Sequence, residues 1–257
     1  LYVFARDMTE RRERENEIRR LNTDLEQRTL SLQLLNQELE SFSYSLAHDL
    51  RTPLRSISAY SEMILAGEAG DVTPEALKMV RTIQRNSGRM TQLMDDFLAF
   101  FRVARKDVKQ EKIVMTAIAR EAIATVQVDA KRQIEFKVGT LPPAKGDPAM
   151  VLQVLVNLVS NSVKFTALKP KAEIEIGCMA DRSPTVYYVK DNGVGFNMKY
   201  YSRLFGVFER LHRREEFDGT GIGLAIVQKI VQRHGGSVWA ESVVDHGATF
   251  YFTLAPA

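Results

Sequence analysis

The stretch SYSLAHDLRTPLRSISAYSEM, residues 43–63, places a histidine beside an acid within a pattern that otherwise favours a helix. An imidazole with its ordinary pKa of about 6.5 is largely neutral near pH 7, so His48 could serve as a nucleophile. The Asp49 carboxylate could accept the Nδ1 proton, or hold the tautomer that leaves Nε2 free to attack.

Thr52 lies one helical turn on and shares the face of His48. Pro53 removes one backbone hydrogen bond and is expected to kink the helix. The alternative for a lone helical histidine is a solvated surface residue.

Three further segments have residue types suited to a nucleotide: NLVSNSVKF at 157–165, DNGVGF at 191–196 and GTGIGL at 219–224. Glycines let backbone N–H groups approach phosphates closely, and the start of a helix favours negative charge. The chain has neither a GxxxxGK[ST] loop nor a βαβ dinucleotide fingerprint. Each segment taken alone is equally compatible with an ordinary turn or helix entry.

Apolar residues in alternating steps of three and four precede the histidine and indicate a coiled coil. Counting from Leu46 at an a position places His48 at c, exposed and off the seam. Arg28 interrupts the seam, and we expect a charge there to permit switching at a cost in stability. The seam residues are Ile18, Leu21, Leu25, Leu32, Leu35, Leu39, Phe42 and Leu46.

A second helix is predicted to begin where Thr73 supplies a capping hydroxyl and Pro74 the first turn. Two amphipathic helices bury their stripes poorly alone, so we expect two such hairpins to form a dimeric four-helix bundle. The alternative is a hairpin that packs on the second domain of its own chain. The stripe of the second helix is Val80, Ile83, Ser87, Met90, Met94, Phe97 and Phe101.

From about residue 107 onward the pattern becomes α+β. Alternating or short apolar runs predict strands, and longer stretches with helical spacing predict helices. Together they predict a mixed sheet with helices on one face. The expected strands are 112–115, 134–138, 173–179, 186–189, 237–240 and 249–254, and the expected helices are 148–165 and 221–233.

Bulk composition limits the class of protein. The 257 residues carry a net charge of +3, which does not suggest a partner such as nucleic acid. The single cysteine, Cys178, excludes an intrachain disulfide and favours a reducing compartment, so a cytoplasmic location is expected. No apolar run approaches the roughly 18 residues that a membrane span needs. The chain begins without Met, and we expect it to be part of a longer protein.

The order of the motifs resembles that of the sensor histidine kinases of two-component systems. HDLRTPL, NLVSNSVKF, DNGVGF, LFGVFERLH and GTGIGLAIV follow one another over about residues 40–257. FERLHRREEFDGTGIGLAIVQKIVQRHGG is most similar to the phytochrome-type branch, and LYVFARDMTERR is similar to the exit strand of a PAS sensor domain. The resemblance implies the end of a PAS-like sensor at 1–12, a signalling coiled coil at 13–41, a dimerisation and phosphotransfer domain at 42–106, and a gyrase-like (Bergerat) ATP-binding α/β sandwich at 107–257.

The resemblance also implies an activity. In that family the histidine of HDLRTPL, here His48, takes the γ-phosphoryl group of ATP and passes it to an aspartate of a response regulator. A hydroxyl at the position of Thr52 orients water that dephosphorylates the regulator, so phosphatase activity is expected too. The implied partners are a second copy of the chain, joined through the helical bundle, a receiver domain and an upstream sensor.

ATP and Mg²⁺ are the implied cofactors. Asn161 is expected to bind Mg²⁺, Lys164 to meet the phosphates, and Asp191 to accept from the exocyclic amine of adenine. A lid over 197–218 would be anchored by Phe205 and Phe208, unless these rings serve ordinary core packing. Arg210 is expected at the γ-phosphate or on an acid of the bundle. The other implied nucleotide contacts are Asn157, Gly193, Gly195, Gly219, Gly221, Gly223, Leu224 and, near adenine, Thr249.

Two other functional classes remain as alternatives. Gyrase-type and chaperone ATPases share this nucleotide fold but carry a glutamate base one helical turn before the metal-binding asparagine. Asn157 stands at that place, and an amide cannot take a proton from water. The sequence therefore favours transfer to a protein nucleophile over hydrolysis. The other alternative is a dimeric module that only transmits conformation, and the intact nucleotide motifs do not favour it.

Overall fold

The computed structural model describes residues 17–19, 21–29, 50–67, 70, 72–105, 107–126, 128, 132–179, 182–211, 217 and 219–254. The chain divides into two units, Leu1–Arg55 and Ser56–Ala257. His48, Asp49 and the seam positions from Leu32 to Leu46 lie outside the described residues. Within the described ranges, no helix combines the length and the apolar character that a bilayer crossing requires.

The first unit is helical at residues 17–19 and 21–29. The three seam residues described there, Ile18, Leu21 and Leu25, are all more than half exposed. Arg28, the charge in the seam, pairs with Asp24 at 2.9 Å, one helical turn before it. Because the rest of the seam lies outside the described residues, the coiled coil stays a prediction.

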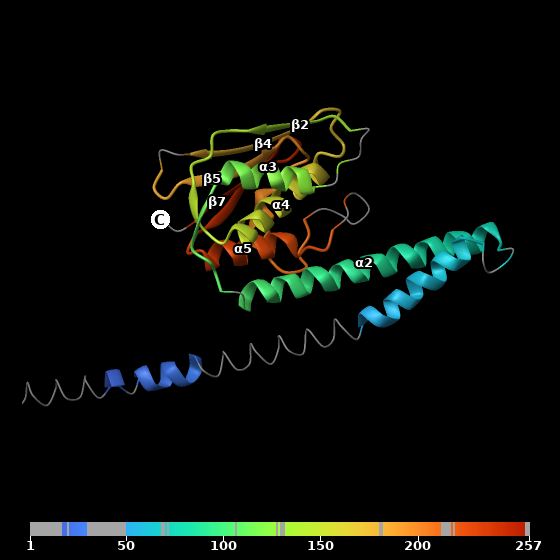
Figure 1. The fold of residues 1–257 in the computed structure, drawn as a ribbon, viewed down its shortest axis with the longest axis horizontal. Helices are drawn as coiled ribbons and strands as arrows, with labels where there is room; N and C mark the ends of the chain where they lie inside the picture. The colour runs from blue at the N-terminus through green and yellow to red at the C-terminus, as the bar shows by residue number, and fades with distance from the viewer. Residues whose placement is uncertain are drawn as a thin grey trace, which may run out of the picture. The chain divides into compact units, whose positions relative to one another are not determined.

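The helical hairpin consists of a helix at residues 50–65 and the longer α2 (Pro74–Arg105), which Figure 1 draws in cyan and green. The chain leaves the first helix through Gly67, whose φ of +83° suits glycine. The predicted start of α2 is confirmed, because the Thr73 hydroxyl accepts a hydrogen bond from the Ala76 N–H at 3.2 Å. The hydroxyls of Ser58 and Ser87 lie 3.0 Å apart and join the two helices.

The predicted apolar stripe of α2 is partly buried within the chain and partly exposed. Ser87 and Met94 are buried within the chain, whereas Ile83 and Met90 are about half exposed. On the first helix, Ile57 is likewise half exposed. The hairpin of a single chain therefore leaves part of its apolar surface uncovered.

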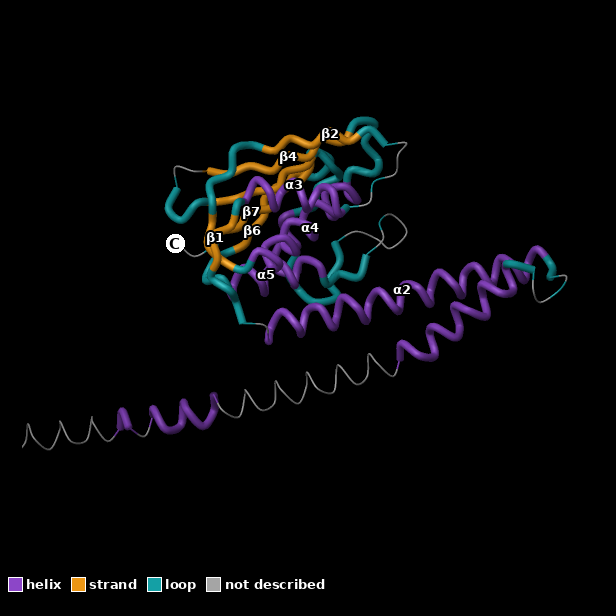
Figure 2. Tube along the Cα trace, in the orientation of Figure 1, coloured by secondary structure: helices purple, strands orange, loops and turns teal. Residues whose placement is uncertain are grey.

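The region from residue 107 onward contains a mixed sheet with helices on one face, as predicted (Figures 1 and 2). Its five described strands lie in the order β2-β4-β5-β7-β6, where β2 runs parallel to β4 and every other pair is antiparallel. A small antiparallel pair, β1-β3, lies apart from it. The strands are β1 (Glu111–Ile113), β2 (Ile134–Val138), β3 (Ala144–Gly146), β4 (Ala172–Met179), β5 (Val186–Asp191), β6 (Val238–Val243) and β7 (Gly247–Thr253).

Three α-helices of the described chain pack with this sheet: α3 (Met115–Thr125), α4 (Pro148–Phe165) and α5 (Gly223–Arg233). A short 3₁₀ helix, η1 (Met198–Arg203), follows β5. Helix α4 begins at a proline, and the Asp147 side chain accepts from the Met150 N–H at 3.1 Å. His234, just after α5, accepts from the Asp147 N–H at 3.0 Å, and its other ring nitrogen lies 2.8 Å from the Ile230 carbonyl oxygen. The start of α4 is thereby tied to the end of α5.

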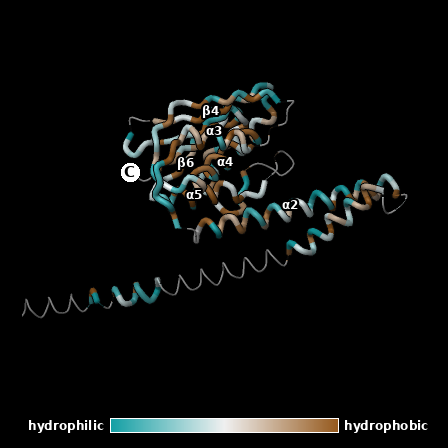
Figure 3. Tube along the Cα trace, viewed as in Figure 1, coloured by the Kyte–Doolittle hydropathy of each residue, from teal (hydrophilic) through white to brown (hydrophobic). Residues whose placement is uncertain are grey.

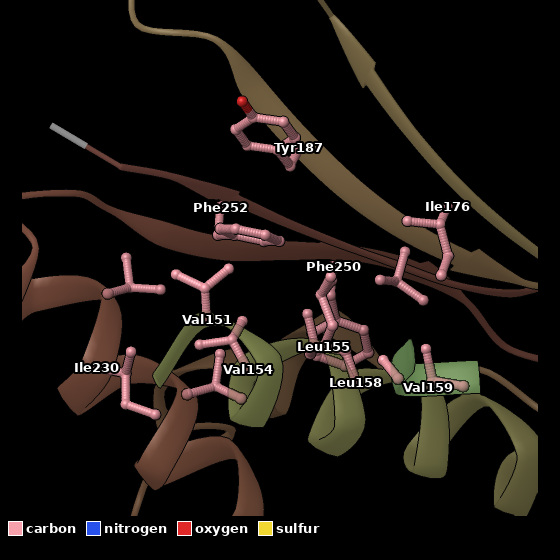
Figure 4. Packing of buried hydrophobic residues seen from close by; sticks show 14 of the residues in the cluster. Val151, Val154, Leu155, Leu158, Val159, Ile176, Tyr187, Ile230, Phe250 and Phe252 are labelled. Atoms are coloured by element: carbon pink, nitrogen blue, oxygen red, sulfur yellow. The ribbon is translucent and has the colours of Figure 1, made fainter. Parts of the chain in front are cut away.

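The core lies between the sheet and the apolar face of α4. Figure 4 shows Val151, Val154, Leu155, Leu158 and Val159 pointing from α4 toward the strands, and all five are essentially inaccessible to solvent. In Figure 3 the hydrophobic colour gathers on α4, α5 and the central strands. Burying one such side chain contributes roughly 1.5–3 kcal/mol relative to leaving it exposed, so this contact holds the domain together.

One predicted strand is wrong in its second half. The apolar run 112–115 was expected to be a strand, but β1 ends at Ile113, and Met115 begins helix α3. Met115, Ala119 and Ala122 are buried at spacings of four and three residues, which is the helical period. Alanines carry a weak hydrophobic signal, and for that reason the pattern did not predict α3. Strand β3 was also not predicted, because it is only three residues long.

We expect Leu158→Ala to lower the free energy of unfolding by about 2–5 kcal/mol, because it leaves a cavity in a fully buried part of the core. Chemical denaturation followed by circular dichroism measures this loss. The matched control is Leu168→Ala, where the side chain is 71% exposed and the expected change is within about 0.5 kcal/mol. Equal losses at the two positions would contradict the assignment of the core.

Candidate nucleotide site

A cavity of about 370 Å³ opens beside α4. Its walls come from α4, from β5 and β7, from the segment after η1, from the start of α5 and from one face of α2. The cavity brings together most of the predicted nucleotide residues. Those that line it are Asn157, Asn161, Lys164, Asp191, Gly195, Arg210, Gly219, Gly221, Gly223 and Leu224.

Helix α4 presents a polar face to this cavity. Asn157, Asn161 and Lys164 are separated by four and three residues, so they share one side of the helix. The Asn157 amide donates to the Gln153 carbonyl at 2.8 Å, which turns its oxygen outward, toward the start of α5. A Cβ at Gly223 would lie 2.7 Å from that oxygen, so a side chain there would crowd Asn157. The Lys164 ammonium lies 4.3 Å from the centroid of the Phe165 ring, within cation–π range.

Asp191, at the end of β5, is the buried acid of the site and is only 5% exposed. Its Oδ1 accepts from the backbone N–H groups of Gly193 at 2.9 Å and Ala248 at 3.3 Å. Its Oδ2 accepts from the Ser162 hydroxyl of α4 at 3.2 Å. Burial raises the pKa of Asp191 above its usual value, and the three hydrogen bonds oppose this only in part.

Two glycines of the motifs are required by the backbone. Gly195 has a φ of +60°, and a Cβ there would lie 2.2 Å from the Val243 carbonyl oxygen. Gly221 has a φ of +77°, and its Cβ would meet the Glu209 carbonyl oxygen at 2.8 Å. Gly193 does not line the cavity and acts instead through its N–H on Asp191.

The segment at 219–224 leads into α5 next to the cavity. The N-cap residue of α5 is Ile222, whose side chain has no oxygen to cap the helix. Gly223 and Leu224 line the cavity, so the first turn of α5 borders it. A Cβ at Gly219 would lie 3.0 Å from the Lys164 ammonium. The positive end of a helix dipole and a lysine therefore meet at one end of the cavity.

Arg210 binds backbone carbonyls of the segment that leads into α5. Its guanidinium donates to the Gly219 carbonyl at 2.9 Å and to the Phe217 carbonyl. It thereby joins the two sides of the segment 212–216, which lies outside the described residues. Contacts of Arg210 with the γ-phosphate or with an acid of the bundle stay predictions.

The two lid phenylalanines lie in different surroundings. Phe205 packs against the core and meets Tyr201 edge-on at 6.3 Å between ring centroids. Phe208 is 55% exposed, and its ring stacks on Phe97 of α2 at 6.0 Å. Its φ is +64°, and its N–H donates to the Gly221 carbonyl at 3.0 Å.

Thr249 does not line the cavity, contrary to the expectation that it lies near adenine. Side chains of a strand alternate between faces, and its neighbours Ala248 and Phe250 are the ones that reach the cavity. Thr249 lies on the opposite face with Tyr251, which stacks on Trp239 at 5.4 Å.

Sequence reasoning missed several residues of the site. Ser162 had a signal, since a polar residue on the apolar side of α4 needs a partner, and the partner is Asp191. Gln92 and Asp96 of α2 also line the cavity, as does Thr220. Thr220 lies within GTGIGL but was not singled out. Nothing in the local sequence of Gln92 and Asp96 points to a nucleotide, because their place in the cavity depends on how two distant segments pack.

We expect the stability difference between the wild type and Asp191→Asn to depend on pH. A raised pKa means that the folded chain binds this proton more tightly than the unfolded chain does. The contribution of Asp191 is therefore complete below about pH 3.8 and is lost as pH rises through the folded value. Relative to Asp191→Asn, the wild type should lose free energy of unfolding as the pH rises above about 3.8. Denaturant titrations at each pH test this, and a difference that stays constant or grows would contradict it.

Comparisons with known proteins agree with this geometry. Residues 38–105 match the family described as His Kinase A (phospho-acceptor) domain, and residues 146–257 match that of the Histidine kinase-, DNA gyrase B-, and HSP90-like ATPase. Cyanobacterial phytochrome B of Nostoc sp. is 34% identical over 235 residues, which cover 90% of this chain and 31% of that protein. Sensor histidine kinase WalK of Bacillus subtilis is 30% identical over 230 residues, covering 86% of this chain and 37% of that protein.

The fold has solved counterparts as well. Full-length ShkA in complex with AMPPNP superposes with a TM-score of 0.61 at 24% sequence identity, covering 84% of this chain and 46% of that one. The chain spans about a third of the length of the phytochromes that it matches. A helical hairpin matching the phospho-acceptor family precedes an ATP-binding sandwich, and the alignments with phytochrome B and WalK cover 90% and 86% of the chain. The chain therefore belongs to the sensor histidine kinases of two-component systems.

Proposed function

We propose that the chain phosphorylates its own His48 with ATP and passes the phosphoryl group to an aspartate of a response regulator. The observation that carries this proposal is the set of residues that line the cavity. It combines a buried acid, a lysine and a helix N-terminus with an α4 face that bears amides in place of a general base. This set suits binding and orienting a nucleotide whose γ-phosphoryl group goes to an outside nucleophile.

Asp191 is proposed to bind the adenine ring. A carboxylate offers about four acceptor sites, and three are used by Gly193, Ala248 and Ser162. The remaining capacity can accept from the exocyclic amine. Phe196 and Phe250 supply apolar surface nearby in the cavity. A buried acceptor that would otherwise lack a donor discriminates strongly in favour of a base with an amine.

The triphosphate is proposed to lie at the opposite end, where Lys164 and the first turn of α5 meet. Backbone N–H groups at a helix N-terminus and a nearby ammonium both stabilise phosphate oxygens. Asn161 is the proposed Mg²⁺ ligand through its amide oxygen, which is a hard donor of the kind this ion takes. Among the residues that the structure describes, no group of three His, Cys, Asp or Glu side chains could hold a metal, so phosphate oxygens and water would complete the shell. A bound Mg²⁺ would neutralise charge on the phosphates.

Transfer is favoured over hydrolysis by the same face of α4. The polar α4 residues that line the cavity are Asn157, Ser160, Asn161 and Lys164, and none can act as a carboxylate base for water. In the proposed reaction Nε2 of His48 attacks the γ-phosphorus, an N–P bond forms, and the bond to the β-phosphate oxygen breaks to release ADP. Asp49 holds the Nδ1 proton during attack. The phosphoryl group then moves to the carboxylate of the regulator, which restores the neutral imidazole.

Dimerisation through the helical hairpin is part of the proposal. Ile57, Met63, Ile83 and Met90 are between 42% and 49% exposed on the two helices. A second hairpin would cover this apolar surface and complete a four-helix bundle. The match to the phospho-acceptor domain over residues 38–105 supports the same arrangement.

A regulator phosphatase activity is the second proposed reaction. Thr52 is exposed on the helix of residues 50–65, so its hydroxyl can meet a docked partner. Thr52 is four residues after His48, so in the helix that the sequence predicts there it would share the face of His48 and could orient a water molecule toward an aspartyl phosphate.

Incubation with γ-labelled ATP and magnesium should place an acid-labile, base-stable label on the chain, because a phosphoramidate has that stability pattern. His48→Ala should abolish the label. His246→Ala is the matched control, since this histidine is exposed on the turn between β6 and β7, and it should retain full labelling. An unlabelled wild type that still binds ATP would favour the module that only transmits conformation, and labelling that survives in His48→Ala would exclude His48 as the acceptor.

Thr52→Ala should slow the loss of phosphate from a phosphorylated receiver domain by about tenfold or more, because a positioned group that assists proton transfer typically contributes at least that much. The measurement uses a receiver that accepts label from this chain, freed of ATP before the decay is followed. Thr82→Ala on α2, whose hydroxyl donates to the Lys78 carbonyl, serves as the matched control and should leave the decay unchanged. Unchanged decay in Thr52→Ala would remove the phosphatase role.

A further inference from the structure

The second helix of the hairpin reaches into the nucleotide cavity, and neither the sequence pattern nor the proposed reaction accounts for this. Gln92 and Asp96, one turn apart on α2, both line the cavity. We propose that Asp96 is an acidic latch that ATP must displace, because the carboxylate and the phosphates of ATP compete for the segment 219–221. This inference rests on the proposed nucleotide site.

Both oxygens of the Asp96 carboxylate are held in place. Oδ2 accepts from the Thr220 hydroxyl at 2.5 Å, and Oδ1 accepts from the Gln92 amide at 2.7 Å. The Gln92 bond joins residues four apart on one helix, so it orients the carboxylate before α2 meets the nucleotide domain. The Thr220 bond joins residues 124 positions apart in the chain, so it depends on how the two segments pack.

The latch lies at the end of the cavity that suits phosphate. Thr220 stands between Gly219, whose added Cβ would lie 3.0 Å from the Lys164 ammonium, and Gly221. The first turn of α5 follows two residues later. A negative carboxylate therefore occupies the surroundings that the lysine and the helix dipole make favourable to anions. A triphosphate arriving there would be repelled by Asp96 and would also compete for the Thr220 hydroxyl.

An aromatic contact lies next to the hydrogen bond between Asp96 and Thr220. Phe97, the residue after Asp96, stacks on Phe208 at 6.0 Å between centroids and meets Phe101 edge-on at 4.8 Å. Phe208 has a left-handed backbone, with φ +64°, which is uncommon for a bulky residue. Its N–H donates to the Gly221 carbonyl, so the strained residue and the glycine segment are bonded to each other. Phe97 thus contacts the lid itself, and Asp96 contacts the segment that follows it.

The two contacts make nucleotide binding and α2 docking mutually exclusive at this place. Linkage then requires that whatever loosens α2 from residues 208 and 220 raises the affinity for ATP, and that ATP loosens α2 by the same factor. The competing explanation for an acid near phosphates is a magnesium ligand. The two explanations predict opposite changes in affinity, because removal of a metal ligand weakens Mg-ATP binding, whereas removal of a latch strengthens it.

The test is the dissociation constant of a non-hydrolysable ATP analogue with magnesium, measured by calorimetry on the whole chain. Asp96→Asn keeps an oxygen that can accept from Thr220 but removes the charge, and we expect about fivefold tighter binding at low ionic strength. The gain should shrink toward zero at about 1 M salt, where charges beyond a few ångströms are screened. Asp96→Ala, which removes both the charge and the bond, should show at least the same gain, and adenosine should bind all variants equally.

The matched control is Asp95→Asn, the neighbouring acid, which is exposed and does not line the cavity. It should bind the analogue as the wild type does. Unchanged or weaker binding by Asp96→Asn, an equal gain in Asp95→Asn, or an equal gain for adenosine would each overturn the latch. None of these readouts needs phosphoryl transfer, so they are independent of the labelling of His48.

Discussion

The nucleotide domain depends on one constraint: α4 must bury one side against the sheet while its opposite side forms a wall of the cavity. The valines and leucines from Val151 to Val159 supply the buried side, and they are essentially inaccessible to solvent. Because a helix is rigid over four turns, this packing fixes where Asn157, Asn161 and Lys164 stand. Hydrophobic burial of one side of α4 thus fixes the positions of the polar side chains on its other side.

A buried carboxylate links that helix to the sheet. Asp191 accepts from Ser162 of α4 and from the backbone N–H groups of Gly193 and Ala248. Hydrogen bonds compensate part of the cost of burying the acid, and the raised pKa shows that the compensation is incomplete. This favours ligand binding, because a hydrogen bond from a ligand donor to a buried acceptor is stronger than one to an acceptor exposed to water.

Much of this arrangement was predictable because it is local. The bounds of α4 follow from apolar residues at helical spacing after a proline, and the cap of α2 follows from Thr73 before Pro74. Asp191 and the glycines of the cavity were identified from short motifs whose order is informative. These features share one property: each is determined by residues within a few positions of one another.

The features that were missed depend on packing between distant segments or on weak local signals. Helix α3 buries alanines, which hydropathy patterns register poorly. Thr249 was placed in the site although strand alternation turns it to the other face, where Tyr251 lies. Arg210 binds the carbonyls of Phe217 and Gly219, and no local sequence rule predicts such bonds. The place of Asp96 follows only from the docking of α2 against the glycine segment.

The tie between Asp147 and His234 has a mechanical consequence for the cavity. It joins the first turn of α4 to the residue after α5, so the two antiparallel helices are pinned together at one end. The cavity borders the other end, where Gly223 faces Asn157, about ten residues or 15 Å along each helix. The hydrogen bond therefore holds the two helices together at the end far from the cavity, whereas a ligand between Gly223 and Asn157 would contact the end that lacks this bond.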